Sequence, residues 1–184
     1  MGETGLSPLG WIVMLAPIGF VLLMSLGFNR LSAGALTILF IVYSIIMGMS
    51  LSFILLVYTQ ASIATTFAIT AGMFGIMAVA GYTTKVDLSK FGSIMMMGLI
   101  GIIIAMLVNM IIGSEQLDYI ISFIGVLVFT GLTAWDVQKI KRIGATAEMG
   151  SDSARKLTIM GALTLYLDFI NLFLFLLRFL GNRK

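Results

Sequence analysis

Residues 157–180 read LTIMGALTLYLDFINLFLFLLRFL, an apolar run in which a single carboxylate, Asp168, lies near the middle. A helix that crosses the hydrocarbon core of a bilayer needs about 20 consecutive apolar residues, so this run is long enough to span a membrane. Within lipid every backbone N–H and C=O has to be paired inside the segment, and the run lacks the alternation of a barrel strand. It therefore predicts a transmembrane helix with a charged group at its midpoint.

Five similar runs precede it, at about 9–27, 33–58, 62–82, 91–113 and 118–138. Of the 184 residues, 60% are hydrophobic and 10% are charged, whereas an ordinary soluble domain is roughly 45–50% apolar and about 25% charged. This composition excludes a water-soluble globule, and no break between the runs is long enough for a separate soluble domain. The sequence predicts one domain, 1–184, which is an all-α integral membrane bundle with six transmembrane helices.

The chain contains no Cys and no His. It therefore excludes a disulfide framework, a thiolate or imidazole metal site, a Ser-His-Asp triad and a histidine pH switch. Any proton chemistry falls to carboxylates, Lys or Tyr. We expect no enzymatic activity, no catalytic residues and no bound cofactor.

Lys and Arg residues are unevenly divided between alternate loops. One side of the predicted bundle carries eight, namely Arg30, Lys85, Lys90, Lys139, Lys141, Arg142, Arg155 and Lys156. Because basic loops stay on the inside, this side is expected to be cytoplasmic, and charges that lie between apolar runs do not indicate a nucleic-acid partner. Both termini are then outside, with no positive residue ahead of the first run, so we expect that a preceding helix lies outside this sequence.

Small residues recur at helical spacing in two runs. They are Ala64, Ala68 and Gly72 in one run, and Gly48 and Ser52 in another. Such spacing lets helix backbones approach closely in lipid, so we expect these faces to pack against neighbouring helices.

Three charged residues fall inside the predicted spans: Asp136, Asp168 and Arg178. A charge at the bilayer centre costs at least about 2.5–3.5 kcal/mol on insertion scales, which makes each a functional candidate. Asp168 is the strongest, because a short carboxylate at mid-helix cannot reach water and has to face the bundle interior. The structural alternative for Asp168 is a protonated side chain hydrogen-bonded to a neighbouring helix. For Asp136 the alternative is an interfacial ion pair with Lys139.

Polar residues support these candidates on the last helix and elsewhere. At helical spacing one face carries Thr164, Asp168, Asn171, Phe175 and Arg178. Arg178 lies near the end of its span, so we expect it to snorkel outward in a structural role. Asn109 and Asn171 are intramembrane amides that either bridge helices or line a path.

A meeting of Asp136 and Asp168 is not obvious from depth alone. At 1.5 Å per residue, Asp136 lies about 3 Å and Asp168 about 15–18 Å from the cytoplasmic face. The offset closes if the fifth span lies deeper, if 153–156 extend the last helix, or if water fills a vestibule there. Two carboxylates that meet in a low-dielectric site cannot both ionise cheaply, so the pair would share a proton at acidic pH. Deprotonation would drive the helices apart and create an oxygen-rich site suited to Ca²⁺.

Two segments carry a resemblance to a known family. The last helix contains LYLDFINLF at 165–173 followed by LLR at 176–178, and the preceding span ends in WDVQKI at 135–140. Together with a looser match, TAGMF at 70–74, these segments resemble the signatures of the transmembrane Bax inhibitor motif family. The likeness covers nearly the whole chain.

The resemblance implies a seven-helix bundle with the last helix at its centre and a pH-sensitive calcium leak as its function. It implies that Asp136 and Asp168 form a paired-carboxylate sensor facing the cytoplasm, with Ca²⁺ and protons as the species handled. The chain departs from the family in showing six spans, without the family's first helix. Residues 9–58 also contain no carboxylate, which puts a further acidic ligand in doubt.

Other functions remain open at this stage. An intramembrane aspartyl protease also needs two Asp residues on neighbouring helices, but neither lies in the Gly-x-Gly-Asp context of such enzymes. A stress or cell-death regulator would act by binding other membrane proteins through its helices. A proton-coupled transporter is disfavoured because no inverted repeat is evident. The short loops favour a bacterial plasma membrane.

Overall fold

The structure, a computed structural model, describes residues 23–24, 26–28, 30–146 and 150–184. The first predicted span, 9–27, lies almost wholly outside these residues. The described part contains five helices long and apolar enough to cross a membrane. They are α2 (Ala33–Val57), α3 (Gln60–Thr83), α4 (Ser89–Ile112), α5 (Glu115–Thr146) and α6 (Asp152–Leu180). The all-helical membrane class is confirmed, and the described residues contain five spanning helices against the six or seven expected for the whole bundle.

Local sequence explains where most of these helices begin and end. The N-cap hydroxyls of Ser32, Thr59 and Ser151 each accept a hydrogen bond from the backbone N–H three residues on, as capping side chains do. Gly113 ends α4 in the left-handed conformation, with φ of 68°, which glycine adopts without a steric penalty. Leu88 precedes α4 without a side-chain cap of its own.

The helices α5 and α6 extend further than their apolar runs predict. The helix α5 ends at Thr146 rather than near 138, and α6 begins at Asp152 rather than near 157. Hydropathy marks where a chain leaves lipid, whereas the helix continues into water because Lys, Arg and Gln are good helix formers. The extension of the last helix, which the depth count left open, is therefore present.

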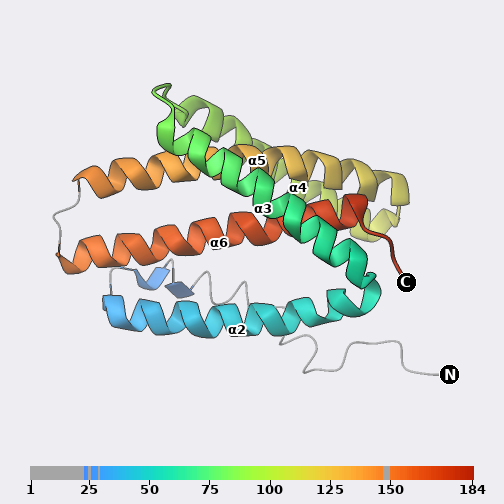
Figure 1. Cartoon of the computed structure of the whole chain (residues 1–184), viewed down its shortest axis with the longest axis horizontal. Coiled ribbons are helices and arrows are strands. Elements are labelled where there is room, and N and C mark those ends of the chain that lie inside the picture. Colours follow the sequence, from blue (N-terminus) through green and yellow to red (C-terminus); the bar gives the residue numbers. More distant parts are fainter. Residues whose placement is uncertain (1–22, 25, 29, 147–149) are drawn as a thin grey trace.

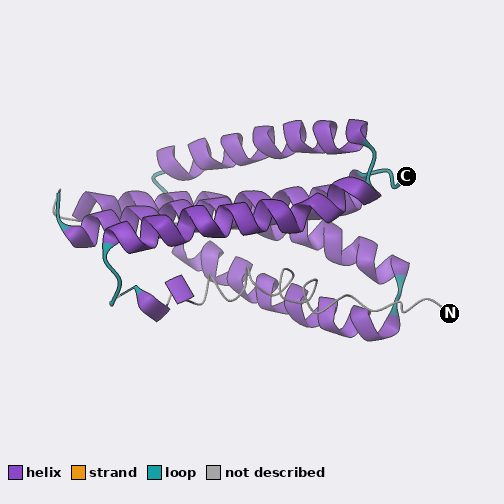
Figure 2. Ribbon diagram, turned by 90° about the horizontal axis from the view of Figure 1, so that it is seen from below, coloured by secondary structure: helices purple, strands orange, loops and turns teal. Residues whose placement is uncertain are grey.

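The helices α5 and α6 form the centre of the described bundle. They make the most extensive helix contact in it, and α6 lies between α5 and α2 (Figure 1). The helix α3 crosses both α5 and α6, whereas α4 packs on α5. In the view turned by 90°, helices and short connections account for all the described residues, and no strand is drawn among them (Figure 2). The expected central last helix is thus one half of a central pair.

The two ends of the bundle differ in charge. The end of α3, the start of α4, the end of α5 and the start of α6 lie together on the left of Figure 1. The eight Lys and Arg residues of the predicted cytoplasmic side belong to these segments and to the start of α2, and we call this the basic end. The C-terminus, the α2–α3 turn and the α4–α5 loop lie at the opposite end, called here the C-terminal end.

Close helix approaches depend on glycines other than those the spacing predicted. A Cβ at Gly72 or Gly48 would meet nothing within 4 Å, and Ala64 and Ala68 are exposed, so the predicted small-residue faces do not pack against any of the described helices. The packed face of α3 instead carries buried Thr66, Thr70 and Gly81. Spacing alone failed here because Ala and Gly also occur on lipid-facing surfaces.

Two glycines bring α3 and α4 onto the central pair, and a third lies within the pair. A Cβ at Gly81 would overlap the backbone carbonyl of Ala134, and one at Gly92 would overlap the Trp135 ring. Within the central pair, a Cβ at Gly125 would run into the Phe175 ring. The first two contacts press α3 and α4 against α5 immediately before Asp136.

We expect Gly81→Ala to destabilise the protein by about 1–3 kcal/mol, because the methyl group would overpack against backbone that cannot move aside. The matched change Gly72→Ala adds a methyl group to an open position on the same helix, where Ala is also the better helix former. Thermal unfolding in detergent, followed by tryptophan fluorescence, measures both. Equal melting temperatures for the two variants would contradict the assigned contact.

Candidate functional site

Asp136 from α5 and Asp168 from α6 face each other inside the central helix pair. The two carboxyl groups lie within hydrogen-bonding reach of each other. Both are buried, with 6% of Asp136 and 4% of Asp168 exposed. The extended helix ends reduce the depth offset, since ten residues of α5 follow Asp136 and sixteen residues of α6 precede Asp168. The structure thus brings together the two residues that depth counting left apart.

The neighbours of Asp136 on α5 fix the direction of its side chain. Ala134 and Trp135 are held against α3 and α4 by Gly81 and Gly92, which leaves the next residue to face α6. The Lys139 ammonium lies 5.0 Å from the centroid of the Trp135 ring, in a cation–π contact. Among the ion pairs of the described residues, none joins Lys139 to Asp136. The interfacial ion pair that the sequence offered as an alternative is therefore not formed.

One oxygen of the pair has no other partner. Oδ2 of Asp168 is buried and accepts no hydrogen bond from the described residues. An ionised carboxylate is only an acceptor, so two carboxyl groups can bond to each other only when one of them carries a proton. The structural alternative, a protonated Asp168 hydrogen-bonded to a neighbouring helix, predicts the same contact with Asp136 of α5. The geometry suits a pair that holds one proton.

A cavity of about 710 Å³ at the basic end reaches Asp136, the α5 member of this pair. Thr164 also lines it, and Lys139 and Arg155 contribute positive charges. Its remaining walls are mostly apolar, from Phe28, Ile140, Ile143, Leu157 and Met160 among others. Water and small ions therefore have room to approach the carboxyl pair from one side of the bundle.

The supporting polar residues of α6 are satisfied within their own helix. The Thr164 hydroxyl donates to the carbonyl of Met160 at 3.0 Å, and the Asn171 amide donates to the carbonyl of Leu167 at 2.8 Å. Both hydrogen bonds stay within α6. Thr164 lines the cavity as well, whereas the Asn171 bond does not bridge two helices.

Asn109 and Arg178 lie at the C-terminal end, away from the carboxyl pair. Oδ1 of Asn109 accepts the backbone N–H of Ser114 at 3.0 Å, just beyond the end of α4. Arg178 does not simply snorkel outward, because its guanidinium is paired with Asp118 of α5 at 3.3 Å. Hydropathy does not reveal this partner, because the predicted span begins at Asp118 and places that carboxylate at the membrane boundary.

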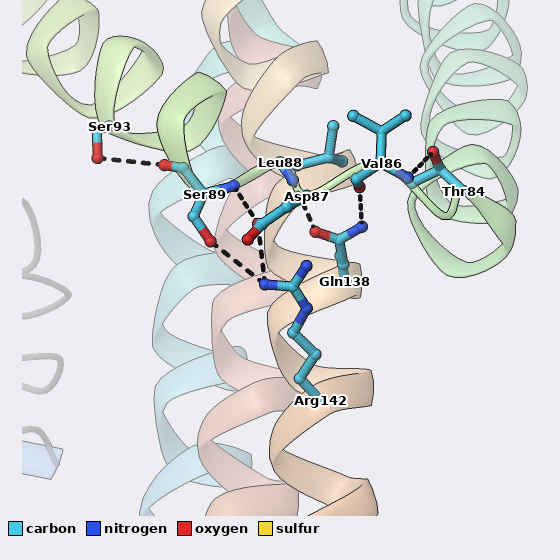
Figure 3. Close-up of polar contacts among 8 residues, drawn as sticks. All are labelled: Thr84, Val86, Asp87, Leu88, Ser89, Ser93, Gln138 and Arg142. Atoms are coloured by element: carbon cyan, nitrogen blue, oxygen red, sulfur yellow. Dashed lines mark hydrogen bonds and ion pairs between the residues drawn. The ribbon is translucent and has the colours of Figure 1, made fainter.

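Gln138 is a second residue whose role the sequence did not reveal. Its amide oxygen accepts the backbone N–H of Leu88 at 2.9 Å, and its amide nitrogen donates to the carbonyl of Val86 at 2.8 Å (Figure 3). The Gln138 oxygen thus accepts the hydrogen bond of the N-cap N–H of α4. In a capping box, a Gln or Glu three residues after the N-cap plays this part. The signal available in the sequence is an amide at the last position of a predicted span, two residues after Asp136.

Charged groups outside the membrane reinforce this docking of the α3–α4 loop. Arg142 donates to Asp87 at 2.9 Å and to the Ser89 hydroxyl at 3.3 Å. Hydrogen bonds from Ser89, and then the Arg142 guanidinium, lower the pKa of Asp87 from 3.8 to about 2. Because a lowered pKa keeps Asp87 ionised, its contribution to docking is complete above about pH 4 and is lost only as the pH falls toward 2.

The carboxylate oxygens of Asp136 and Asp168 are too few to bind a metal ion permanently, and they suit a cation that binds only briefly. The described residues contain no group of three or more Asp, Glu, His or Cys side chains that could hold a metal. Ca²⁺ takes six to eight oxygen ligands, and Asp136 and Asp168 supply only part of such a shell. Ca²⁺ bound there would keep several water molecules.

Comparisons with known proteins agree with the membrane class. A family model described as "Inhibitor of apoptosis-promoting Bax1" matches residues 1–184. The inner membrane protein YbhL of Escherichia coli is 53% identical over 173 residues, which are 94% of this chain and 74% of that protein. An uncharacterized protein of Rickettsia prowazekii, RP147, is 51% identical over 185 residues, covering 100% of this chain and 76% of the other. An uncharacterized membrane protein of Streptococcus pyogenes is 40% identical over 158 residues, which are 85% of this chain and 67% of that protein.

We expect Gln138→Leu to release the α3–α4 loop. Two hydrogen bonds with net values of about 0.5–1.5 kcal/mol each are removed, so amide exchange in 84–89 should quicken by roughly 5- to 150-fold. Hydrogen–deuterium exchange with mass spectrometry measures this. The control Arg142→Gln removes an exposed ion pair with Asp87, worth about 0–1 kcal/mol, and a longer exposed hydrogen bond to Ser89, and should quicken exchange less. Equal exchange in the two variants would argue against the Gln138 contact.

Proposed function

This chain belongs to the Bax inhibitor-1-like family of membrane proteins, and we propose that it acts as a pH-sensitive calcium leak gated by Asp136 and Asp168. The observation that carries the proposal is the buried contact between two carboxyl groups from neighbouring helices. The cavity that reaches the pair from the basic end supports it. By the positive-inside rule that end is cytoplasmic, and the name of the Escherichia coli relative favours the bacterial inner membrane.

The gate follows from what a shared proton does in a medium of low dielectric. With one proton between them, the two carboxyl groups attract each other and hold α5 against α6. Loss of that proton leaves two negative charges in contact, and their repulsion is much stronger there than in water. The helices then separate, and the pair becomes a doubly negative site that attracts Ca²⁺.

Other charged groups around the pair shape this response. Lys139 and Arg155 line the same cavity, and their positive charges stabilise the ionised pair. They also oppose the entry of a bare cation from the basic end. In this proposal the site attracts Ca²⁺ only after deprotonation, when the negative charges of Asp136 and Asp168 offset the positive charges of Lys139 and Arg155. No step of the leak requires catalysis.

The family description also fits a regulator that binds other membrane proteins, and the two functions differ in their dependence on the carboxyl pair. A regulator of that kind would bind its membrane partner equally well after either Asp→Asn change. A leak gated by the pair would lose its pH response after either change. Measuring the pH dependence of Ca²⁺ flux in the Asp→Asn variants therefore distinguishes the leak from the regulator.

We expect Asp168→Asn and Asp136→Asn to abolish most of the pH dependence of Ca²⁺ flux in proteoliposomes. An amide resembles the protonated carboxyl group, so flux should stay near its acidic value as the pH rises from about 5 to 8. The control is Asp87→Asn, because Asp87 has a pKa of about 2 and remains ionised across that range. Its pH profile should match that of the unmodified chain. Flux with an unchanged pH profile in both Asp136 and Asp168 variants would sink the proposal.

A further inference from the structure

We propose that the bundle has a second gate, at the C-terminal end, formed by the stacked rings of Phe129 and Phe175 and locked by the Asp118–Arg178 ion pair. We call these four residues the C-terminal gate. The inference rests on the proposed leak and deepens it, because it states what closes the side of the bundle that the carboxyl pair does not face. All four residues come from α5 and α6.

The aromatic part of this gate fills the seam between the central helices. Phe175 stacks on Phe129 with ring centroids 5.7 Å apart, and both rings are buried. The Phe175 ring lies directly on Gly125, where there is no room for a Cβ. It is seven residues, about two helical turns, beyond Asp168. Leu172 and Leu176 pack in the same apolar cluster, so this seam is dry.

The ion pair joins the first turn of α5 to the last turn of α6. Arg178 donates to Oδ1 of Asp118 at 3.3 Å, and both side chains are about one-third exposed, at 33% and 32%. The guanidinium carbon of Arg178 is also 5.9 Å from the centroid of the Phe175 ring. One side chain therefore contacts both the acidic partner and the ring that closes the seam.

Two cavities meet at this ion pair. One, of about 440 Å³, is lined by polar residues of the C-terminal end that include Glu115 and Arg183. The other, of about 420 Å³, is mainly apolar and is lined by α4 residues such as Ile103 and Met106. Asp118 and Arg178 line both cavities. An ion coming from the C-terminal end thus finds polar surroundings up to the ion pair, and the Phe175 ring lies against the Arg178 guanidinium there.

The two gates are carried by the same helix. Asp168, Phe175 and Arg178 all belong to α6, and the helix between them is continuous. A displacement of α6 that follows repulsion at the carboxyl pair would move Phe175 and Arg178 relative to α5. The Asp118–Arg178 pair resists that displacement at the far end. Loss of the pair should therefore open the seam without changing the groups that titrate.

The test uses the natural absence of cysteine from the chain. A single cysteine is placed in the seam by Leu172→Cys, since Leu172 is fully buried beside Phe175. The full chain is reconstituted in liposomes, and a small, positively charged, membrane-impermeant thiol reagent is added on the side of the C-terminal end. The rate of modification reports whether the seam is open, independently of any calcium flux.

We expect slow modification of Leu172→Cys alone and modification faster by about fivefold or more when Asp118→Asn or Arg178→Gln is added. The exchanged pair Asp118→Arg with Arg178→Asp should restore slow modification, because the opposite charges still meet. Glu115→Cys, in the polar cavity outside the gate, should react quickly in every background and shows that the reagent reaches a folded protein.

Calcium flux in the same liposomes separates the gate from the leak. Faster modification in both single variants, reversed by the exchanged pair, supports the gate even if no variant passes Ca²⁺, in which case the leak proposal fails alone. A pH-dependent flux in the unmodified chain, together with modification rates unchanged in both single variants, overturns the gate and leaves the leak standing. If the exchanged pair reacts as fast as the single variants, the ion pair is not the lock.

Discussion

The structure depends on the burial of two carboxyl groups in one helix interface. Each would be costly in a membrane if it faced lipid, and neither can satisfy the other unless a proton lies between them. Their positions therefore require α5 and α6 to be neighbours. The other described helices are arranged to keep them so, with α3 and α4 seated on α5 by glycine and α2 packed along α6. A property of two side chains thus determines which helices are central.

Much of the bundle was predictable because the membrane simplifies the problem. Lipid accepts only long apolar helices, so five apolar runs gave five helices in the right places. The predicted C-terminal end of α5 and the predicted N-terminal end of α6 were wrong. Hydropathy falls where the chain meets water, whereas a helix needs only backbone hydrogen bonds and suitable propensities to continue. That error accounts for part of the apparent depth difference between Asp136 and Asp168, which falls to six residues when the observed helix ends are used.

The contacts between helices were predicted less well, because they join residues far apart in the chain. The periodic residues Ala64, Ala68 and Gly72 indicated the wrong face of α3, and nothing around Gly81 in the sequence indicates that Ala134 lies against it. Arg178 was recognised as unusual, but its partner Asp118 is sixty positions away. Family resemblance suggested the Asp136–Asp168 pairing, and only three-dimensional packing gave it a physical basis.

The length of the central helices places the carboxyl pair in a particular electrical environment. At 1.5 Å per residue, the 32 residues of α5 extend about 48 Å, whereas the hydrocarbon core is about 30 Å thick. The helix therefore extends beyond the hydrocarbon core, and the basic residues near its end favour an extension on the side where the cavity opens. A cytoplasmic leaflet rich in anionic lipid has a surface potential of about −30 mV, which concentrates protons about threefold and lowers the local pH by about 0.5. In the proposed leak, a carboxyl pair reached from that side responds to the lipid composition of the membrane as well as to the acidity of the cytoplasm.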